Sequence, residues 1–133
     1  MKIKFLLTLA LCLTLTSIIV SCHHHDEDDS NPPVLLITSP SDNASLPASS
    51  PVHITGTVTD ESLHEMNIKI TNDSNGSILF NKDLEVHDAT NYTINESYTP
   101  TNITSVTHVT MFFVVSDHSE HEVRDTVHFV LNP

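Results

Sequence analysis

Two short segments of the chain concentrate histidine and carboxylate side chains. The first runs Asp60-Glu61-Ser62-Leu63-His64-Glu65, and the second runs Asp117-His118-Ser119-Glu120-His121-Glu122. Imidazole nitrogens with carboxylate oxygens suit Zn²⁺, whereas Ca²⁺ prefers oxygen ligands alone. If the fold brings both segments together, they predict a zinc-type site made by His64, His118, His121, Asp60 and Asp117.

The same residues have a structural interpretation that stays open. Asp60 and Asp117 are well placed to form Asx-type turns, in which a carboxylate accepts a hydrogen bond from the backbone nearby. Surface loops of an acidic chain are also acidic without binding anything. The sequence alone does not choose between a metal site and solvated turns.

Nothing in the sequence indicates catalysis. It contains no Gly-x-Ser-x-Gly segment that would place a serine nucleophile on a sharp elbow. With two glycines in 133 residues, it has no phosphate-binding loop, and without tryptophan it lacks the usual platform for sugars. We therefore expect a protein that is not an enzyme and has no cofactor other than the zinc of the metal-site interpretation.

Strands must position these loops. About seven apolar or alternating runs, rich in Val, Ile, Thr, Tyr and Phe, lie within residues 34–133 and are separated by turn signals. Val52, Ile54, Gly56 and Val58, for example, share one face of an alternating run. This pattern predicts an all-β, immunoglobulin-like antiparallel sandwich, whose second and sixth loops lie at the same pole.

The late strands suggest a second candidate surface. In the run from His108 to Val115, Phe113 shares a face with the core-type residues, which leaves Phe112 and Val114 on the outer face. His128 and Val130 of the last run join them there. An outward apolar patch would suit a protein partner, whereas a covering loop or strand would make it ordinary packing.

The N-terminus carries a leader. Lys2 and Lys4 precede an uncharged apolar stretch that is too short and wrongly flanked for a membrane span. Its end, Ile19-Val20-Ser21-Cys22, resembles the bacterial lipobox. That resemblance implies cleavage of residues 1–21 and lipidation of Cys22, so that acyl chains anchor the protein to a membrane.

A tether follows the lipidated cysteine. Residues 22–33 contain three histidines, then Asp26 to Asp29 and two prolines, a composition that predicts disorder. The acidic run resembles the export signal of surface lipoproteins of Bacteroidetes, which implies an outer-membrane anchor and exposure on the cell surface. After cleavage, three basic residues face 17 acidic ones, a formal charge of −14, so we expect no nucleic-acid partner.

Three further motifs extend this resemblance. They are Pro-Val-Leu-Leu-Ile-Thr-Ser-Pro-Ser-Asp near residue 34, Val-His-Ile-Thr-Gly-Thr-Val-Thr-Asp from Val52, and Val-Val-Ser-Asp-His-Ser-Glu-His-Glu from Val114. They resemble the single-domain immunoglobulin-like lipoproteins of Bacteroidetes. The resemblance implies a membrane-anchored, non-catalytic binding or structural module with a protein or glycan partner. The alternative is a zinc-type metal-binding lipoprotein that uses the histidine-rich loops.

Overall fold

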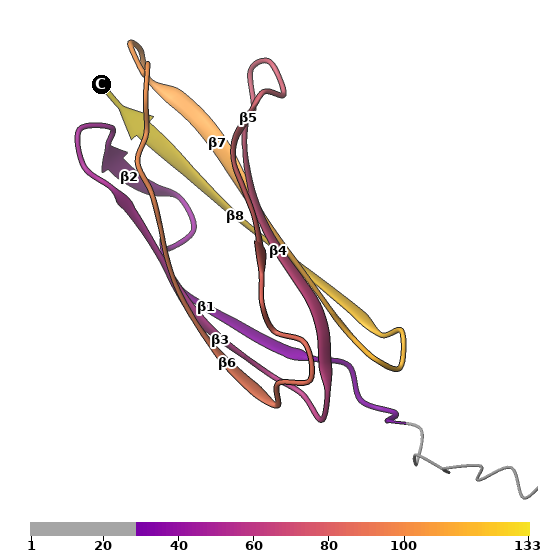
Figure 1. The fold of residues 1–133 in the computed structure, drawn as a ribbon. Helices are drawn as coiled ribbons and strands as arrows, with labels where there is room; N and C mark the ends of the chain where they lie inside the picture. The colour runs from indigo at the N-terminus through magenta and orange to yellow at the C-terminus, as the bar shows by residue number, and fades with distance from the viewer. Residues whose placement is uncertain (1–28) are drawn as a thin grey trace, which may run out of the picture.

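The computed structural model describes residues 29–133, which form eight strands and no helix. The strands are β1 (Val34–Ser39), β2 (Ala44–Pro47), β3 (Val52–Thr59), β4 (Leu63–Asn72), β5 (Ile78–Leu84), β6 (Asn91–Tyr98), β7 (Thr107–Asp117) and β8 (Glu122–Asn132). They make one sheet in the order β1-β3-β6 and another in the order β2-β8-β7-β4-β5. The two sheets pack as layers (Figure 1), so the expected all-β sandwich is confirmed.

One strand was not expected from the sequence. Residues 44–47 form the short β2, which pairs in parallel with β8, so the strands number eight and not all pairs are antiparallel. Four residues ending in Pro47 are too short to show a period, and they lie between two segments rich in turn residues. Pro47 is tolerated because β2 is an edge strand, where a missing N–H breaks no ladder.

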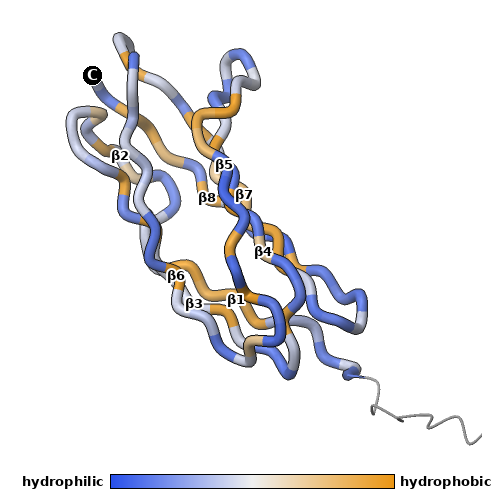
Figure 2. Tube along the Cα trace, viewed as in Figure 1, coloured by the Kyte–Doolittle hydropathy of each residue, from blue (hydrophilic) through white to orange (hydrophobic). Residues whose placement is uncertain are grey.

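The core follows from the alternation of apolar residues along the strands. In β3, Val52, Ile54 and Val58 are at most 2% exposed. In β7, the side chains of Met111, Phe113 and Val115 are fully buried, as the sequence predicted. Figure 2 shows the apolar residues along the strands and polar residues in the turns at the ends of the sandwich.

Three connections gather at one end of the sandwich. They are the β3–β4 turn, the segment between β5 and β6, and the β7–β8 turn (Figure 1). The described chain also begins at this end, where Asp29 lies close to Asp60. We call this end the loop pole.

The predicted leader, Cys22 and all but the last residues of the predicted tether lie outside the described residues. Between residues 29 and 133, no helix is long and apolar enough to cross a membrane.

Candidate metal centre

The β3–β4 turn and the start of β4 form backbone hydrogen bonds with both other connections at the loop pole. The amide of Asp88 donates to the carbonyl of Leu63 at 2.8 Å, and the amide of Leu63 donates to the carbonyl of Ala89 at 2.9 Å. The amide of His118 donates to the carbonyl of Ser62 at 3.1 Å. Backbone hydrogen bonds therefore hold the segment after β5 and the β7–β8 turn against the same short turn.

The backbone at Asp88 has an unusual conformation that this arrangement requires. Its φ is +62°, in the left-handed region that most residues avoid and that aspartate tolerates better than most. The amide of the next residue, Ala89, bonds back to the carbonyl of Val86 at 2.9 Å and closes the turn. This tight reversal carries His87 and Asp88 side by side on the surface.

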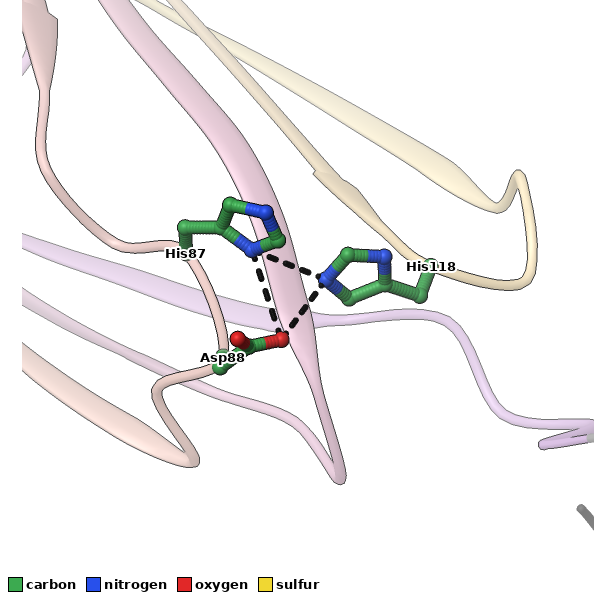
Figure 3. Close-up of side chains that lie close together, drawn as sticks. All are labelled: His87, Asp88 and His118. Atoms are coloured by element: carbon green, nitrogen blue, oxygen red, sulfur yellow. Dashed lines mark hydrogen bonds and ion pairs between the residues drawn. The ribbon is translucent and has the colours of Figure 1, made fainter.

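Three side chains converge there (Figure 3). His118 Nε2 lies 3.0 Å from His87 Nδ1 and 3.0 Å from Asp88 Oδ1, and His87 Nδ1 lies 3.3 Å from the same oxygen. The side chains of His87, Asp88 and His118 are 60%, 77% and 38% exposed, so water reaches all three. We call these three residues the His/Asp cluster.

The spacing of the His/Asp cluster matches that of metal ligands. Zn²⁺ binds imidazole nitrogen and carboxylate oxygen at about 2.0–2.2 Å, which in a tetrahedral site separates neighbouring ligand atoms by about 3.3–3.6 Å. The observed separations of 3.0–3.3 Å are only slightly shorter. The three donor atoms therefore form a group that could hold one metal ion, and the same distances fit a hydrogen bond between the two imidazoles and an ion pair of each with Asp88.

His64 packs against the His/Asp cluster. Its ring centroid lies 4.6 Å from that of His118 and 5.4 Å from that of His87, the second contact being edge to face. The sequence predicted that His64 and His118 would lie at one site, and their rings are in contact in the structure. His64 restricts the space available to the other two imidazoles and so helps to orient them.

The other predicted ligands lie in different contacts. His121 Nδ1 is 2.7 Å from Asp117 Oδ2, and the His121 amide donates to Asp117 Oδ1 at 2.8 Å. Burial alone would raise the pKa of Asp117, but hydrogen bonds and charge from His121, with a backbone hydrogen bond from Ser119, hold it below its usual value. Asp117 is thus kept ionised by the turn that it closes.

Asp60 belongs to a group of three carboxylates. Asp29, Asp60 and Asp117 each place one oxygen within 4.8 Å of the others, and one buried oxygen of Asp29 has no hydrogen-bond partner among residues 29–133. Asp60 Oδ1 also accepts from the amide of Ser62 at 2.9 Å, the geometry of an Asx turn. This group contains oxygen ligands alone and is distinct from the His/Asp cluster.

His87 and Asp88 were not among the residues predicted from the sequence. They follow a run in which Leu84 and Val86 are buried, so the alternation alone indicates that His87 points outward. The path of the next segment is set by the hydrogen bonds to Leu63, which no local pattern reveals. The one available signal was an adjacent His-Asp pair just after a strand.

The predicted partner surface is less apolar than the sequence suggested. Phe112 and Val114 are half-buried, and Lys69 Nζ lies 5.3 Å from the centre of the Phe112 ring. His128 is exposed, with Nδ1 3.0 Å from the hydroxyl of Thr110, and Val130 is half-buried. Lysine and polar side chains interrupt the outer face, so the four residues do not form a continuous apolar patch.

No family model and no curated protein matches this sequence. A crystal structure of an engineered protein is similar, with 18% identity, a TM-score of 0.55 and 76% of this chain covered. The chain spans 20% of that protein's length. CopC from Methylosinus trichosporium OB3b has 16% identity and a TM-score of 0.47, covering 75% of this chain and 95% of CopC. The likeness to the engineered protein is a likeness of fold.

Proposed function

We propose that this protein is a membrane-anchored, non-catalytic binding module that captures one divalent transition-metal ion. The main observation in support of this proposal is the His/Asp cluster, whose three donor atoms lie 3.0–3.3 Å apart. Imidazole with carboxylate favours Zn²⁺ and Cu²⁺ over Mg²⁺ and Ca²⁺, which prefer oxygen alone. Three protein ligands leave a position for water or for a donor from a partner.

Binding fits the site better than catalysis does. A catalytic metal works best in a cavity that excludes water and holds the substrate. His87 and Asp88 are instead more than half exposed at the tip of a turn. An ion there can enter and leave freely, which suits capture and exchange.

The proposed anchor is the lipid on Cys22, in an outer membrane and facing the cell surface. Its support is the leader and the lipobox-like Ile19-Val20-Ser21-Cys22. Six residues lie between Cys22 and Asp29 at the loop pole, and the seven Cα-to-Cα steps from Cys22 to Asp29 span at most about 25 Å even in a fully extended chain. An anchored protein would therefore hold the His/Asp cluster close to the membrane.

Calorimetric titration of the mature protein with Zn²⁺ and Cu²⁺ tests the metal proposal. All proteins should carry serine in place of the three tether histidines, so that residues 23–25 contribute no binding. We expect one ion per chain, and a loss of affinity of at least tenfold in the variant His87→Ala/His118→Ala.

The matched control is His53→Ala/His108→Ala, which removes two exposed histidines that lie outside the His/Asp cluster. It should bind as tightly as the parent protein. Equal affinity in both double variants would refute the metal proposal.

The anchor has a separate test. Intact-mass analysis of the protein from membranes should show residues 1–21 removed and acyl chains on Cys22. The variant Cys22→Ala should leave the membrane fraction. Retention of the leader, or an unmodified Cys22, would exclude the anchor without affecting the metal site.

A further inference from the structure

A groove opens beside the His/Asp cluster. Its volume is about 480 Å³, within the range of binding sites for small ligands. It lies between β4, the segment after β5, and the ends of β7 and β8 that face the loop pole. His64 and His87 contribute to its wall, so the groove adjoins the candidate metal centre.

The wall of the groove is strongly acidic. It includes the carboxylates of Glu65, Asp83, Glu85 and Glu122 and no lysine or arginine. Glu122 is paired with Arg124, which does not line the groove. Among the contacts of residues 29–133, Asp83 accepts a hydrogen bond from the neutral amide group of Asn67 at 2.7 Å and has no ion pair.

In the described part of the chain, the other two carboxylates of the groove, Glu65 and Glu85, are free of such partners. Within residues 29–133, neither Glu65 nor Glu85 has an ion pair, and both are exposed. The lysine nearest to Glu85 in sequence, Lys82, turns to the other sheet, where its Nζ lies 2.6 Å from Glu96. The lysine nearest to Glu65, Lys69, places its Nζ 5.3 Å from the centre of the Phe112 ring. Among the described residues, Glu65 and Glu85 thus give the groove negative charge that no ion pair balances.

Apolar surface lies among these carboxylates. Val114 is half-buried and lines the groove together with the largely buried Leu84. A lysine or arginine side chain has an aliphatic stem and a cationic head, and such side chains lay the stem along apolar surface. A free metal ion or a compact cation would use only the carboxylates.

We infer that this groove binds a short basic segment of a partner polypeptide. The aliphatic stems of its lysine or arginine side chains lie along Val114, and their charged heads pair with Glu65 and Glu85. The mature chain's formal charge of −14 would speed the approach of such a segment. This inference goes beyond metal capture and requires no ion at the His/Asp cluster.

Fluorescence polarisation with the full mature protein tests the inference. The probe is a labelled seven-residue peptide that alternates lysine with valine, and the comparison is the same peptide with every lysine acetylated. Chelator in all samples separates this binding from metal binding. We expect the lysine peptide to bind at least tenfold more tightly, with an affinity that falls as salt is raised.

Two double variants locate the binding. Glu65→Gln/Glu85→Gln should weaken it at least fivefold, whereas Glu61→Gln/Asp125→Asn, with the same change in charge outside the groove, should weaken it less than twofold. The protein without substitutions gives a second readout that no misfolding of a variant can affect. On peptide addition, the amide chemical shifts of residues 65 and 85 should change, and that of residue 125 should not.

Three outcomes would overturn the inference. One is equal weakening by the two double variants, which would show attraction to a general acidic surface. Another is equal binding of the acetylated peptide. The last is binding of spermidine at the groove without binding of the lysine peptide, which would identify a free polyamine as the ligand.

Discussion

The imidazole Nδ1 of His121 lies 2.7 Å from Oδ2 of Asp117, a carboxylate whose side chain is only 1% exposed. The backbone amide of Asp117 also donates to the carbonyl of His121 at 3.1 Å. These contacts join the first and last residues of the turn that carries His118. The pair therefore stabilises the loop pole and positions one member of the His/Asp cluster.

The first prediction concerns Asp117→Asn. At neutral pH we expect the variant to lose about 1–3 kcal/mol of unfolding free energy, because a buried, charge-assisted hydrogen-bond group is weakened. The native state holds the pKa of Asp117 below that of the unfolded chain, so it binds fewer protons. Its contribution is therefore complete above about pH 4 and is lost as the pH falls through the native pKa.

Urea unfolding at pH 7 and at two or more values below pH 4 measures this effect. The difference between the parent protein and Asp117→Asn should shrink as the pH falls. A difference that grows or stays constant on acidification would show that the ionised carboxylate does not supply the stability. The exposed Asp125→Asn is a suitable control and should change stability little at either pH.

The second prediction concerns Gly56, in the middle of β3. A Cβ atom at this position would lie 2.4 Å from the backbone oxygen of Leu36 and 3.2 Å from the Cα of Ile37, both in β1. Backbone atoms of a paired strand do not move aside easily, so Gly56→Ala should force β1 away from β3. We expect a loss of about 1–3 kcal/mol or more, as for other overpacked sites.

Gly76→Ala provides the comparison in the same urea experiment. Gly76 has a φ of +70° and no atom near its Cβ position, so alanine there costs only backbone strain of about 1–2 kcal/mol. Amide exchange distinguishes the two variants. Faster exchange along β1 and β3 is expected in Gly56→Ala alone, and unchanged exchange there would contradict the steric argument.

The sandwich itself follows from a period of two that is visible in the sequence. Alternation in β3 and β7 identifies the buried faces, because each strand has one face in water and one against the opposite sheet. Phe113 and Phe112 are neighbours in the chain, and their different burial was predicted from that period alone. The short β2 was missed because four residues cannot show such a period.

The candidate metal centre was predictable only in part. The meeting of His64 and His118 follows from two turns at one pole of a sandwich. His87 and Asp88 join them because hydrogen bonds to Leu63 fix the segment after β5, a contact made by backbone atoms that any sequence supplies. His121 carries the same chemical signal as His118, but its ring bonds to Asp117, so composition could not separate the two.

The third prediction uses the neighbouring phenylalanines of β7. Phe113 is fully buried, and Phe113→Ala should cost about 3–5 kcal/mol, because it leaves a cavity in the core. Phe112 is half-buried on the outer face beside Lys69, so Phe112→Ala should cost much less, about 1 kcal/mol for the area that it leaves uncovered. Urea unfolding of both variants checks the ratio, and similar losses would mean that Phe112 also packs in a core.

The last prediction uses the backbone at Asp88 to separate metal binding from folding. An ion that binds only the native state, present at 100 times its dissociation constant, stabilises it by about 2.7 kcal/mol. For a domain of this size that corresponds to a rise in Tm of roughly 10–20 °C. We expect Zn²⁺ to produce such a rise in a protein with the tether histidines replaced, and a chelator to reverse it.

Asp88→Gly should remove most of that rise and leave the Tm without metal nearly unchanged. Glycine adopts the observed φ of +62° without strain, so the variant loses the ligand and keeps the turn. Asp88→Ala also loses the carboxylate but must hold alanine at positive φ, which should cost about 1–2 kcal/mol without metal. If Zn²⁺ stabilises Asp88→Gly as strongly as the parent protein, Asp88 is not a ligand. If the two variants have the same Tm without metal, the turn relaxes on substitution.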